Sequence, residues 1–430
     1  MCLSGILIFS GLPDTFRNFQ HYTEQVKVMS TVLQADNEVP FLDPSDPGFS
    51  IRSDTVRRAR DLSWWARTPY GVAVLRYEEM KEMINHPLLR QGSYRWPDHN
   101  RASGLWAQWW KRMMLNREGT DHARLRKLGA PAFAPRLVAG MIPKFQELAD
   151  ELIRDFEADG KCEFMSRFAE PYATRVVCSL VGVSHSQWHE FADLAVTMGL
   201  ALGVTYARDE ARVDAATERF FAIAEQIVAE RRREPRDDFI SALINANADK
   251  DALSDQELYD MIVLSIFGGI DTTRSQIGLA MAMFVEHPDQ WALLGDNPHL
   301  ARPAVEEVMR LRPTTTWVTR EATEDFEFKG VEITKGTTIH LFSSAAASDP
   351  DHFTPGFDIT AKRKPHFGFG GGKHHCIGSQ IARGDMTQAL MLLAQRLKNP
   401  VYDGEPQWLP DSGNTGPVTL PIAFDTSQVT

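Results

Sequence analysis

Apolar residues follow a helical spacing through the middle of the chain. Between about residues 136 and 310 they recur every three or four positions, which places them on one face of each helix. From about residue 317 to 342 the pattern changes to short runs rich in Thr, Val, Phe and Ile, interrupted by Lys329-Gly330 and Lys335-Gly336. Such runs between turn residues predict short strands. The pattern therefore predicts a mainly α-helical domain with small β-sheets.

One predicted helix is unusually long and apolar. Ser254 and Glu257 have the spacing of a capping box, and the helical pattern continues from there to His287-Pro288, where proline ends it. A helix of this length spans about 50 Å, which is wider than most domains. Residues 261–270 are apolar on all sides. We therefore expect this helix to cross the molecule and to be buried.

Composition and charge narrow the class of protein. The chain has 430 residues, of which 43% are hydrophobic and 24% charged, as in ordinary globular proteins. Length alone suggests about three domains, but no repeat or linker divides the sequence, so we expect a single domain. The net charge of −11 disfavours nucleic acid as the main partner.

Cysteine usage and the N-terminus bear on the compartment. The four cysteines are too few and too far apart for a disulfide framework or an iron–sulfur cluster, so we expect a reducing compartment, the cytoplasm. The apolar stretch at residues 5–9 is far too short to span a membrane. Residues 1–28 are interpreted either as a leader or as a frayed terminus, with the single domain at residues 29–430.

The long helix carries an unusual polar motif, Gly268-Gly269-Ile270-Asp271-Thr272. Each glycine costs about 1 kcal/mol relative to alanine within a helix, and a buried carboxylate needs a partner. A flat ligand lying against the helix explains the glycines, and Thr272 is placed to bond to the carbonyl of Gly268. The alternative is close packing against another helix, with Asp271 in a structural ion pair.

A second motif surrounds a single cysteine, in the segment from Phe369 to Gly378. A phosphate-binding loop is excluded because histidine follows Gly372-Lys373 where Ser or Thr is needed. A zinc site built from His366, His374, His375 and Cys376 lacks a second cysteine pair. A thiolate at Cys376, just before a predicted helix at residues 377–394, is favoured by the helix dipole and suits a metal ligand.

These motifs resemble those of the cytochrome P450 family. The haem-binding signature F-x-x-G-x-x-x-C-x-G is matched at Phe369, Gly372, Cys376 and Gly378, and Gly370 and His374 also fit its common bacterial form. The segment from Gly268 to Thr272 resembles the family's oxygen-activating motif. Glu307 and Arg310 resemble its E-x-x-R pair. The similarity extends from about residue 40 to the C-terminus.

The resemblance implies both a fold and a reaction. The fold is the triangular, helix-rich P450 domain, with haem b between the long central helix and the cysteine loop. Cys376 is the implied axial ligand of the iron, and Asp271 and Thr272 are implied to deliver protons to bound O2. The implied reaction inserts one oxygen atom into a small to medium apolar organic substrate.

The resemblance also assigns supporting residues. It places His122, Arg126, Arg320 and His374 at the haem propionates, and each of them taken alone is an ordinary cation. It places Gly268, Gly269, Phe369 and Gly378 beside the haem. Glu307 and Arg310 are implied to hold the loop beneath it. The family's third member of that pair is displaced here, with Ala361 in its position and Arg363 nearby. Gly384 occupies a position where a larger apolar residue is usual, which we expect to weaken the packing behind the ligand loop.

Electrons must come from outside the chain, because only 54 residues follow Cys376. The family implies a ferredoxin and an NAD(P)H-dependent ferredoxin reductase as partners. Cations at residues 362–364, Lys373 and Arg383 suit an acidic ferredoxin. The alternative interpretation is an ordinary solvated charge run.

The substrate region is the least defined part of the sequence. By analogy with the family, the pocket is formed by Trp96, Val263, Ile266, Phe267, Thr315, Trp317 and Pro417. Tyr94, Trp106, Trp109 and Trp110 are interpreted either as aromatic pocket residues or as plain core. Alternatives to the monooxygenase are a peroxide-dependent or isomerase-type enzyme on the same fold, and a haem gas sensor. Retained Asp271 and Thr272 argue against the first of these.

Overall fold

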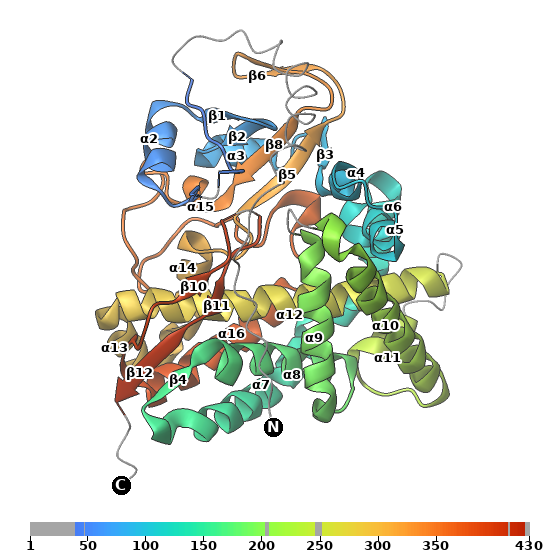
Figure 1. Ribbon diagram of the computed structural model, residues 1–430, viewed down its shortest axis with the longest axis vertical. Coiled ribbons are helices and arrows are strands. Elements are labelled where there is room, and N and C mark those ends of the chain that lie inside the picture. The colour runs from blue at the N-terminus through green and yellow to red at the C-terminus, as the bar shows by residue number, and fades with distance from the viewer. Residues whose placement is uncertain (1–38, 47, 203–205, 246–251, 412, 426–430) are drawn as a thin grey trace.

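The computed structural model describes residues 39–46, 48–202, 206–245, 252–411 and 413–425. The predicted leader at residues 1–28 lies outside these ranges. Figure 1 shows a large helical region surrounding one long helix, with a smaller β-rich region above it. None of the helices in the described ranges combines the length and apolar composition that crossing a bilayer requires.

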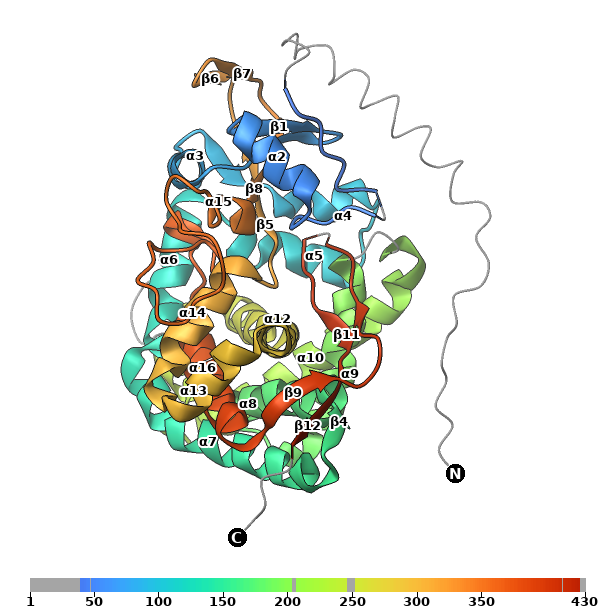
Figure 2. The same cartoon turned by 90° about the vertical axis from the view of Figure 1, so that its left-hand side faces the viewer.

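The long helix α12 (Asp255–Glu286) runs across the molecule in Figure 1 and is seen nearly end-on in Figure 2. Its 32 residues span about 48 Å. The predicted capping box is present: the amide of Glu257 donates to Ser254 Oγ at 3.2 Å, and the amide of Ser254 donates to Glu257 Oε2 at 2.8 Å. The buried central helix is confirmed.

Ten helices form the helical region around α12 in the described ranges. They are α5 (Leu105–Arg112), α6 (Gly119–Gly129), α7 (Pro135–Phe156), α8 (Glu170–Val181), α9 (Trp188–Gly199), α10 (Tyr206–Arg233), α11 (Phe239–Asn245), α13 (Pro288–Asp296), α14 (Ala301–Leu311) and α16 (Ser379–Arg396). Helix α16 starts two residues later than predicted.

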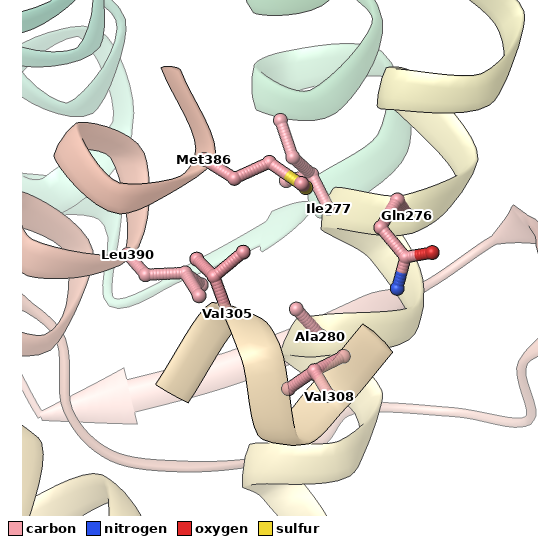
Figure 3. Close-up of a pocket in the computed structure, with 7 residues that line it drawn as sticks. All are labelled: Gln276, Ile277, Ala280, Val305, Val308, Met386 and Leu390. Carbon is pink, nitrogen blue, oxygen red and sulfur yellow. The ribbon is translucent and has the colours of Figure 1, made fainter. Parts of the chain in front are cut away.

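Apolar side chains join α12, α14 and α16 at the centre of this region (Figure 3). Ile277 and Ala280 of α12 face Val305 of α14 and Leu390 of α16, and the gap between them leaves no room for a water molecule. Gly384 of α16 lies at a different contact, that with α7, where an added methyl group would lie 3.2 Å from Val138 Cγ1. The side chains of α7 thus take up the space at Gly384, and the expected weakness is not found.

The β-rich region contains a five-stranded sheet with the order β1-β2-β8-β5-β3, in which only β2 and β8 run parallel. Its strands are β1 (Trp65–Thr68), β2 (Gly71–Val74), β3 (Leu89–Gln91), β5 (Trp317–Ala322) and β8 (Thr338–Phe342). Four short helices lie in or beside this region: α2 (Asp54–Leu62), α3 (Tyr77–Met83), α4 (Trp96–His99) and α15 (Ser343–Ala346).

The remaining strands form small ladders. The hairpin of β6 (Phe326–Phe328) and β7 (Val331–Ile333) turns at Lys329 and Gly330, with φ of +48° and +80°. Strand β4 (Lys161–Glu163) interrupts the helical region and pairs with β12 (Pro421–Asp425), which also pairs with β9 (Lys398–Tyr402). Strands β10 (Gln407–Trp408) and β11 (Pro417–Thr419) form the last pair. The strands predicted at residues 317–342 are confirmed, whereas β4 was not predicted.

Candidate active site

Cys376 lies in a glycine-rich bend that leads into α16. Its amide donates to the carbonyl of Phe369 at 2.9 Å, and the bend turns at Gly370 and Gly372, whose φ values of +68° and +61° favour glycine. The Cys376 side chain lies deep among protein atoms, yet its surface is accessible. The sulfur is therefore uncovered on one side and can bind a group placed there.

The electrostatics around Cys376 suit a thiolate ligand. Burial raises the pKa of the thiol, and the backbone amides of Gly378 and Ser379 together with the cations Arg126 and Arg383 act in the opposite direction. These amides belong to the first turn of α16, where the helix dipole favours negative charge. A coordinating metal deprotonates a thiol outright, so the remaining cost of burial does not prevent ligation.

The histidines near Cys376 are held by different carboxylates. Nε2 of His366 lies 2.9 Å from Oε2 of Glu306 on α14, whereas Nε2 of His374 lies 3.0 Å from Oε1 of Glu118, the residue before α6. Arg383 also pairs with Glu306, and its guanidinium carbon lies 4.3 Å from the ring centroid of Phe369. These contacts draw His366 and His374 to separate elements, which argues against the zinc alternative.

The two glycines of α12 serve different purposes. A methyl group built on Gly268 would meet no atom within 4 Å. The same methyl group on Gly269 would lie only 2.9 Å from Val177 Cγ2 of α8. Gly268 thus leaves the helix surface open to a flat ligand, and Gly269 permits close packing of two helices. The packing interpretation therefore holds for Gly269, and the ligand interpretation of Gly268 stays a prediction.

The hydroxyl and the acid of the motif both have partners on α12. Thr272 Oγ1 donates to the carbonyl of Gly268 at 2.6 Å, as the sequence predicts. Asp271 Oδ1 lies 3.2 Å from Nη2 of Arg274, one turn further along the helix. The Asp271 side chain is 18% exposed, so the ion pair is largely shielded from solvent.

Helix α6 brings the cysteine loop and α12 together. A methyl group on Gly129, the last residue of α6, would lie 2.7 Å from Sδ of Met261 on α12 and 3.8 Å from Cδ1 of Ile377, the residue after Cys376. Three elements therefore meet around Gly129. Met261 precedes Gly268 by seven residues, or about two helical turns.

The residues expected at the propionates include two buried donors without partners. The ring centroids of His122 and His374 are 4.2 Å apart. Among the residues that the structure describes, Nδ1 of His374 and Nη2 of Arg320 find no hydrogen-bond partner, although both side chains are buried. Burial lowers the pKa of Arg320 to about 10 and, with the charges of His374 and Arg126, that of His122 to about 4. Unpaired buried donors of this kind fit the carboxylates of haem.

The E-x-x-R pair forms as predicted, and its third partner is Arg363. Arg310 donates Nε and Nη2 to the two carboxylate oxygens of Glu307 at 2.7 Å each, and Nη1 to the carbonyl of Ala347 at 2.7 Å. Nη2 of Arg363 lies 3.1 Å from Glu307 Oε1. The displaced arginine thus reaches the pair, and the segment before the cysteine loop is tied to α14.

The residues of α12 that share the face of Gly268 are partly different from the expected pocket residues. Val263 and Ile266 are fully buried in the core, because the helix turns their side chains away from the face of Gly268. Leu264 lies one turn before Gly268 on the same face and is partly exposed. Phe267 is 6% exposed. Family analogy thus missed Leu264, which the four-residue spacing from Gly268 identifies.

The tryptophans before α6 are mainly core residues. Trp106, Trp109 and Trp110 of α5 are all buried, and the rings of Trp106 and Trp110 stack at 4.7 Å. The ring of Trp109 makes an edge contact with Phe267 at 6.1 Å, which joins α5 to α12. The core interpretation therefore applies to these three side chains. Trp109 is the one that reaches the motif region.

The remaining pocket candidates lie on three other segments. Trp96 is partly buried and donates Nε1 to the carbonyl of Ala201 at 2.7 Å. Trp317 stacks on Phe342 of the five-stranded sheet at 5.5 Å. These contacts fix both indole rings against protein.

The segments containing Thr315 and Pro417 are brought together. Thr315 Oγ1 donates to Asn414 Oδ1 at 3.1 Å. Pro417 lies against Gly278, where an added methyl group would come within 2.5 Å of its ring. Gly278 is ten residues beyond Gly268, or about 15 Å along α12. Pro417 therefore packs well beyond the glycine motif.

Comparisons with known proteins agree with this geometry. The family model for cytochrome P450 matches residues 172–294 and 297–425. Luteothin monooxygenase of Streptomyces thioluteus is 36% identical over 393 residues, covering 90% of this chain and 96% of the relative. Mycinamicin IV hydroxylase/epoxidase of Micromonospora griseorubida is 31% identical, covering 83% of this chain and 91% of the relative.

Solved structures give the same result. The crystal structure of CalO2 superposes with a TM-score of 0.79 at 28% sequence identity, covering 88% of this chain and 99% of that one. Family match, relatives and fold agree with the uncovered thiol and the unpaired donors beside it. The chain therefore belongs to the cytochrome P450 family and is a monooxygenase that uses haem b.

Proposed function

We propose that this monooxygenase oxidises a small to medium, largely apolar organic metabolite, with electrons from a ferredoxin and an NAD(P)H-dependent ferredoxin reductase. One observation carries the assignment of the site: the thiol of Cys376 is uncovered at the N-terminus of α16, and Arg320 and His374 nearby keep unpaired buried donors. In this proposal the thiolate of Cys376 would ligate the haem iron. His122, Arg126, Arg320 and His374 bind the propionates.

The acid and the hydroxyl of α12 are proposed to handle protons. Bound haem supplies the binding and activation of O2 at its iron. The hydroxyl of Thr272 donates its hydrogen bond to the carbonyl of Gly268. The lone pairs of Oγ1 therefore remain free to accept a proton or to hold a water molecule. The Asp271 carboxylate, held by Arg274, lies next in the chain and relays protons from solvent. Gly268 keeps this face of the helix open.

Surface cations support an acidic electron donor, although fewer than the sequence indicates. Arg363 and Arg383 are only 12% and 14% exposed, and they pair with the buried carboxylate Glu307 and the partly exposed carboxylate Glu306. Lys362 and Lys364 are exposed, and the side chain of Lys373 is 51% exposed. A ferredoxin docked here would meet these three lysines, so their charge should set the association rate and its salt dependence.

The substrate class rests on the apolar lining and on the relatives. Leu264 and Phe267 flank Gly268, and the ring of Trp109 lies against Phe267. The names of the two relatives state that they act on luteothin and on mycinamicin IV. An organic metabolite of comparable polarity suits the apolar side chains that this helix face presents.

The central test is spectroscopic. The reduced protein under carbon monoxide is expected to show the red-shifted Soret band of thiolate ligation, and Cys376→Ser is expected to lose it while Cys178→Ser keeps it. A normal band in Cys376→Ser contradicts the ligand assignment. Substrates are then sought by screening compounds for a shift in the haem spin state.

A turnover assay separates the alternatives. We expect O2 consumption and product with a ferredoxin, its reductase and NAD(P)H, and more hydrogen peroxide per product in Thr272→Ala. Product formation with peroxide alone would indicate a peroxide-dependent enzyme. Tight ligand binding without O2 consumption would indicate a gas sensor.

A further inference from the structure

Glu118 joins three elements that meet at the edge of the proposed haem site. Its Oε1 accepts from the amide of Gln91 at 2.6 Å and lies 3.0 Å from Nε2 of His374. Its Oε2 lies 2.5 Å from Nζ of Lys373. One carboxylate thus connects the end of β3, the start of α6 and the cysteine loop. Neither the P450 motifs in this sequence nor its spacing singles out Glu118.

The contact with His374 leaves one ring nitrogen free. The side chain of His374 is 3% exposed, its Nε2 is taken by Glu118, and its Nδ1 has no partner. The ring lies against that of His122, whose centroid is 4.2 Å away, so two neighbours fix its orientation. Because the Glu118 carboxylate only accepts, Nδ1 can donate to a second carboxylate only when the ring is doubly protonated. In that form a buried nitrogen that is fixed in this way and left unpaired is suited to an acceptor supplied by a ligand.

Gln91 extends the same arrangement to Arg320. Its side-chain oxygen accepts from Nη1 of Arg320 at 2.5 Å, while its backbone amide donates to Glu118. Nη2 of Arg320 has no partner. Glu118 therefore holds His374 directly and supports the strand residue that holds Arg320.

We propose that Glu118 is a positioning residue of the haem site: it fixes His374 through Nε2 so that Nδ1 is presented to a haem propionate, and it anchors the cysteine loop to α6. The inference rests on the proposed role of His374. Groups that orient a cofactor ligand through hydrogen bonds typically contribute 10–100-fold to its affinity. Glu118 and Lys373 also line an open cavity of about 400 Å³.

The test measures the rate at which holoprotein loses haem to excess apomyoglobin. Glu118→Ala is expected to accelerate haem loss about tenfold or more. Glu118→Gln is expected to stay within about threefold of wild type, because an amide oxygen still accepts from His374 and Gln91. Asp121→Asn is the matched control, since Asp121 is an exposed acid of α6 that lines the same cavity. It is expected to leave the rate unchanged.

A double-mutant cycle separates positioning from general destabilisation. In a His374→Ala background, Glu118→Ala should accelerate haem loss clearly less than it does in wild type, because the residue it positions directly is gone and only its contacts with Gln91 and Lys373 remain to be lost. Equal acceleration in both backgrounds would overturn the inference, and so would wild-type haem loss in Glu118→Ala. If His374→Ala itself leaves haem loss unchanged, the proposed propionate role of His374 fails and this inference fails with it. Acceleration in His374→Ala but not in Glu118→Ala rejects the inference alone.

Discussion

Two buried clusters of charged and ring side chains differ in how completely they are paired. The α14 cluster consists of Glu307, Arg310 and Arg363, and the haem-side cluster consists of His122, Arg126, Arg320 and His374. In the α14 cluster, Glu307 and Arg310 are 3% and 2% exposed, and Glu307 bonds to both arginines. Among the described residues, Nε of Arg363 is the one buried nitrogen of this cluster without a partner, whereas in the haem-side cluster both His374 and Arg320 keep an unpaired buried nitrogen.

The difference separates structure from ligand binding. A buried network whose side chains bond mainly to one another and to backbone carbonyls holds elements together and needs no further partner. An unmatched set of buried donors is costly in the chain alone and becomes favourable when an anionic group supplies the acceptors. The first kind explains how the segment before the cysteine loop is held to α14. The second kind is what the proposed binding of the haem carboxylates requires.

The largest expected effect is on the α14 cluster. Glu307→Ala leaves Arg310 buried without its carboxylate, and we expect a loss of about 3–5 kcal/mol in the free energy of unfolding. Urea denaturation of the haem-free protein measures this loss. Glu327→Ala, at an exposed carboxylate of β6, is the control and should change stability by less than about 0.5 kcal/mol. A small loss in Glu307→Ala would show that the cluster is not structural.

Acid should weaken the haem-side cluster through His122. Burial first, then the charges of His374 and Arg126, lower its pKa from 6.5 to about 4 in the folded protein. On acidification His122 is therefore protonated in the unfolded chain before it is protonated in the folded protein. Its contribution to the free energy of unfolding is complete above pH 6.5 and is lost as the pH falls toward 4. Between pH 7 and 5 the loss is about 2 kcal/mol.

The measurement compares urea unfolding of wild type and His122→Gln at pH 7 and pH 5. The variant should lose less stability on acidification, because the group that charges on unfolding is gone. Glu118 does not obscure the result: its pKa is about 2, so its contribution is lost only as the pH falls from about 4.5 toward 2. Equal losses in the two proteins would contradict the assignment to His122.

Removing a donor from the haem-side cluster should weaken haem binding more than folding. Arg320→Leu eliminates a buried cation with an unpaired Nη2. We expect the unfolding free energy of the haem-free protein to change by less than about 1 kcal/mol and haem loss to accelerate about tenfold. Arg310→Leu should instead lower the unfolding free energy of the haem-free protein strongly and change the rate of haem loss less. Strong destabilisation of haem-free Arg320→Leu would place Arg320 with the structural arginines.

The smallest effect concerns the two glycines of α12, which repeat the same contrast within one helix. Gly268→Ala adds a methyl group where no atom lies within 4 Å, so the haem-free protein should gain up to about 1 kcal/mol from helix propensity. Gly269→Ala brings its methyl group to 2.9 Å from Val177 and should lose about 1 kcal/mol. Thermal unfolding of both variants checks the sign. If the unfolding temperatures of both variants shift in the same direction, the distinction between the two glycines is wrong.

Local spacing predicted the elements whose residues are close in the chain. The capping box of Ser254 and Glu257, the Thr272 bond to Gly268, and the Glu307–Arg310 pair all join residues three or four apart, so helix geometry alone brings them together. The strand β4 has its partner about 260 residues away in β12, and no local pattern predicts that pairing. Its three residues are too few for a periodic signal.

The sequence by itself determined the long buried helix, the cysteine bend that precedes α16, and the family resemblance, because each depends on residue types at short fixed spacings. Only the tertiary structure decided that Gly269 packs against α8 while the space beside Gly268 stays open, that Arg363 reaches Glu307, and that Glu118 holds His374. These contacts join residues distant in the chain, and the packing of whole helices sets their distances. Such distances are decided by the sum of many weak contacts, which no single motif encodes.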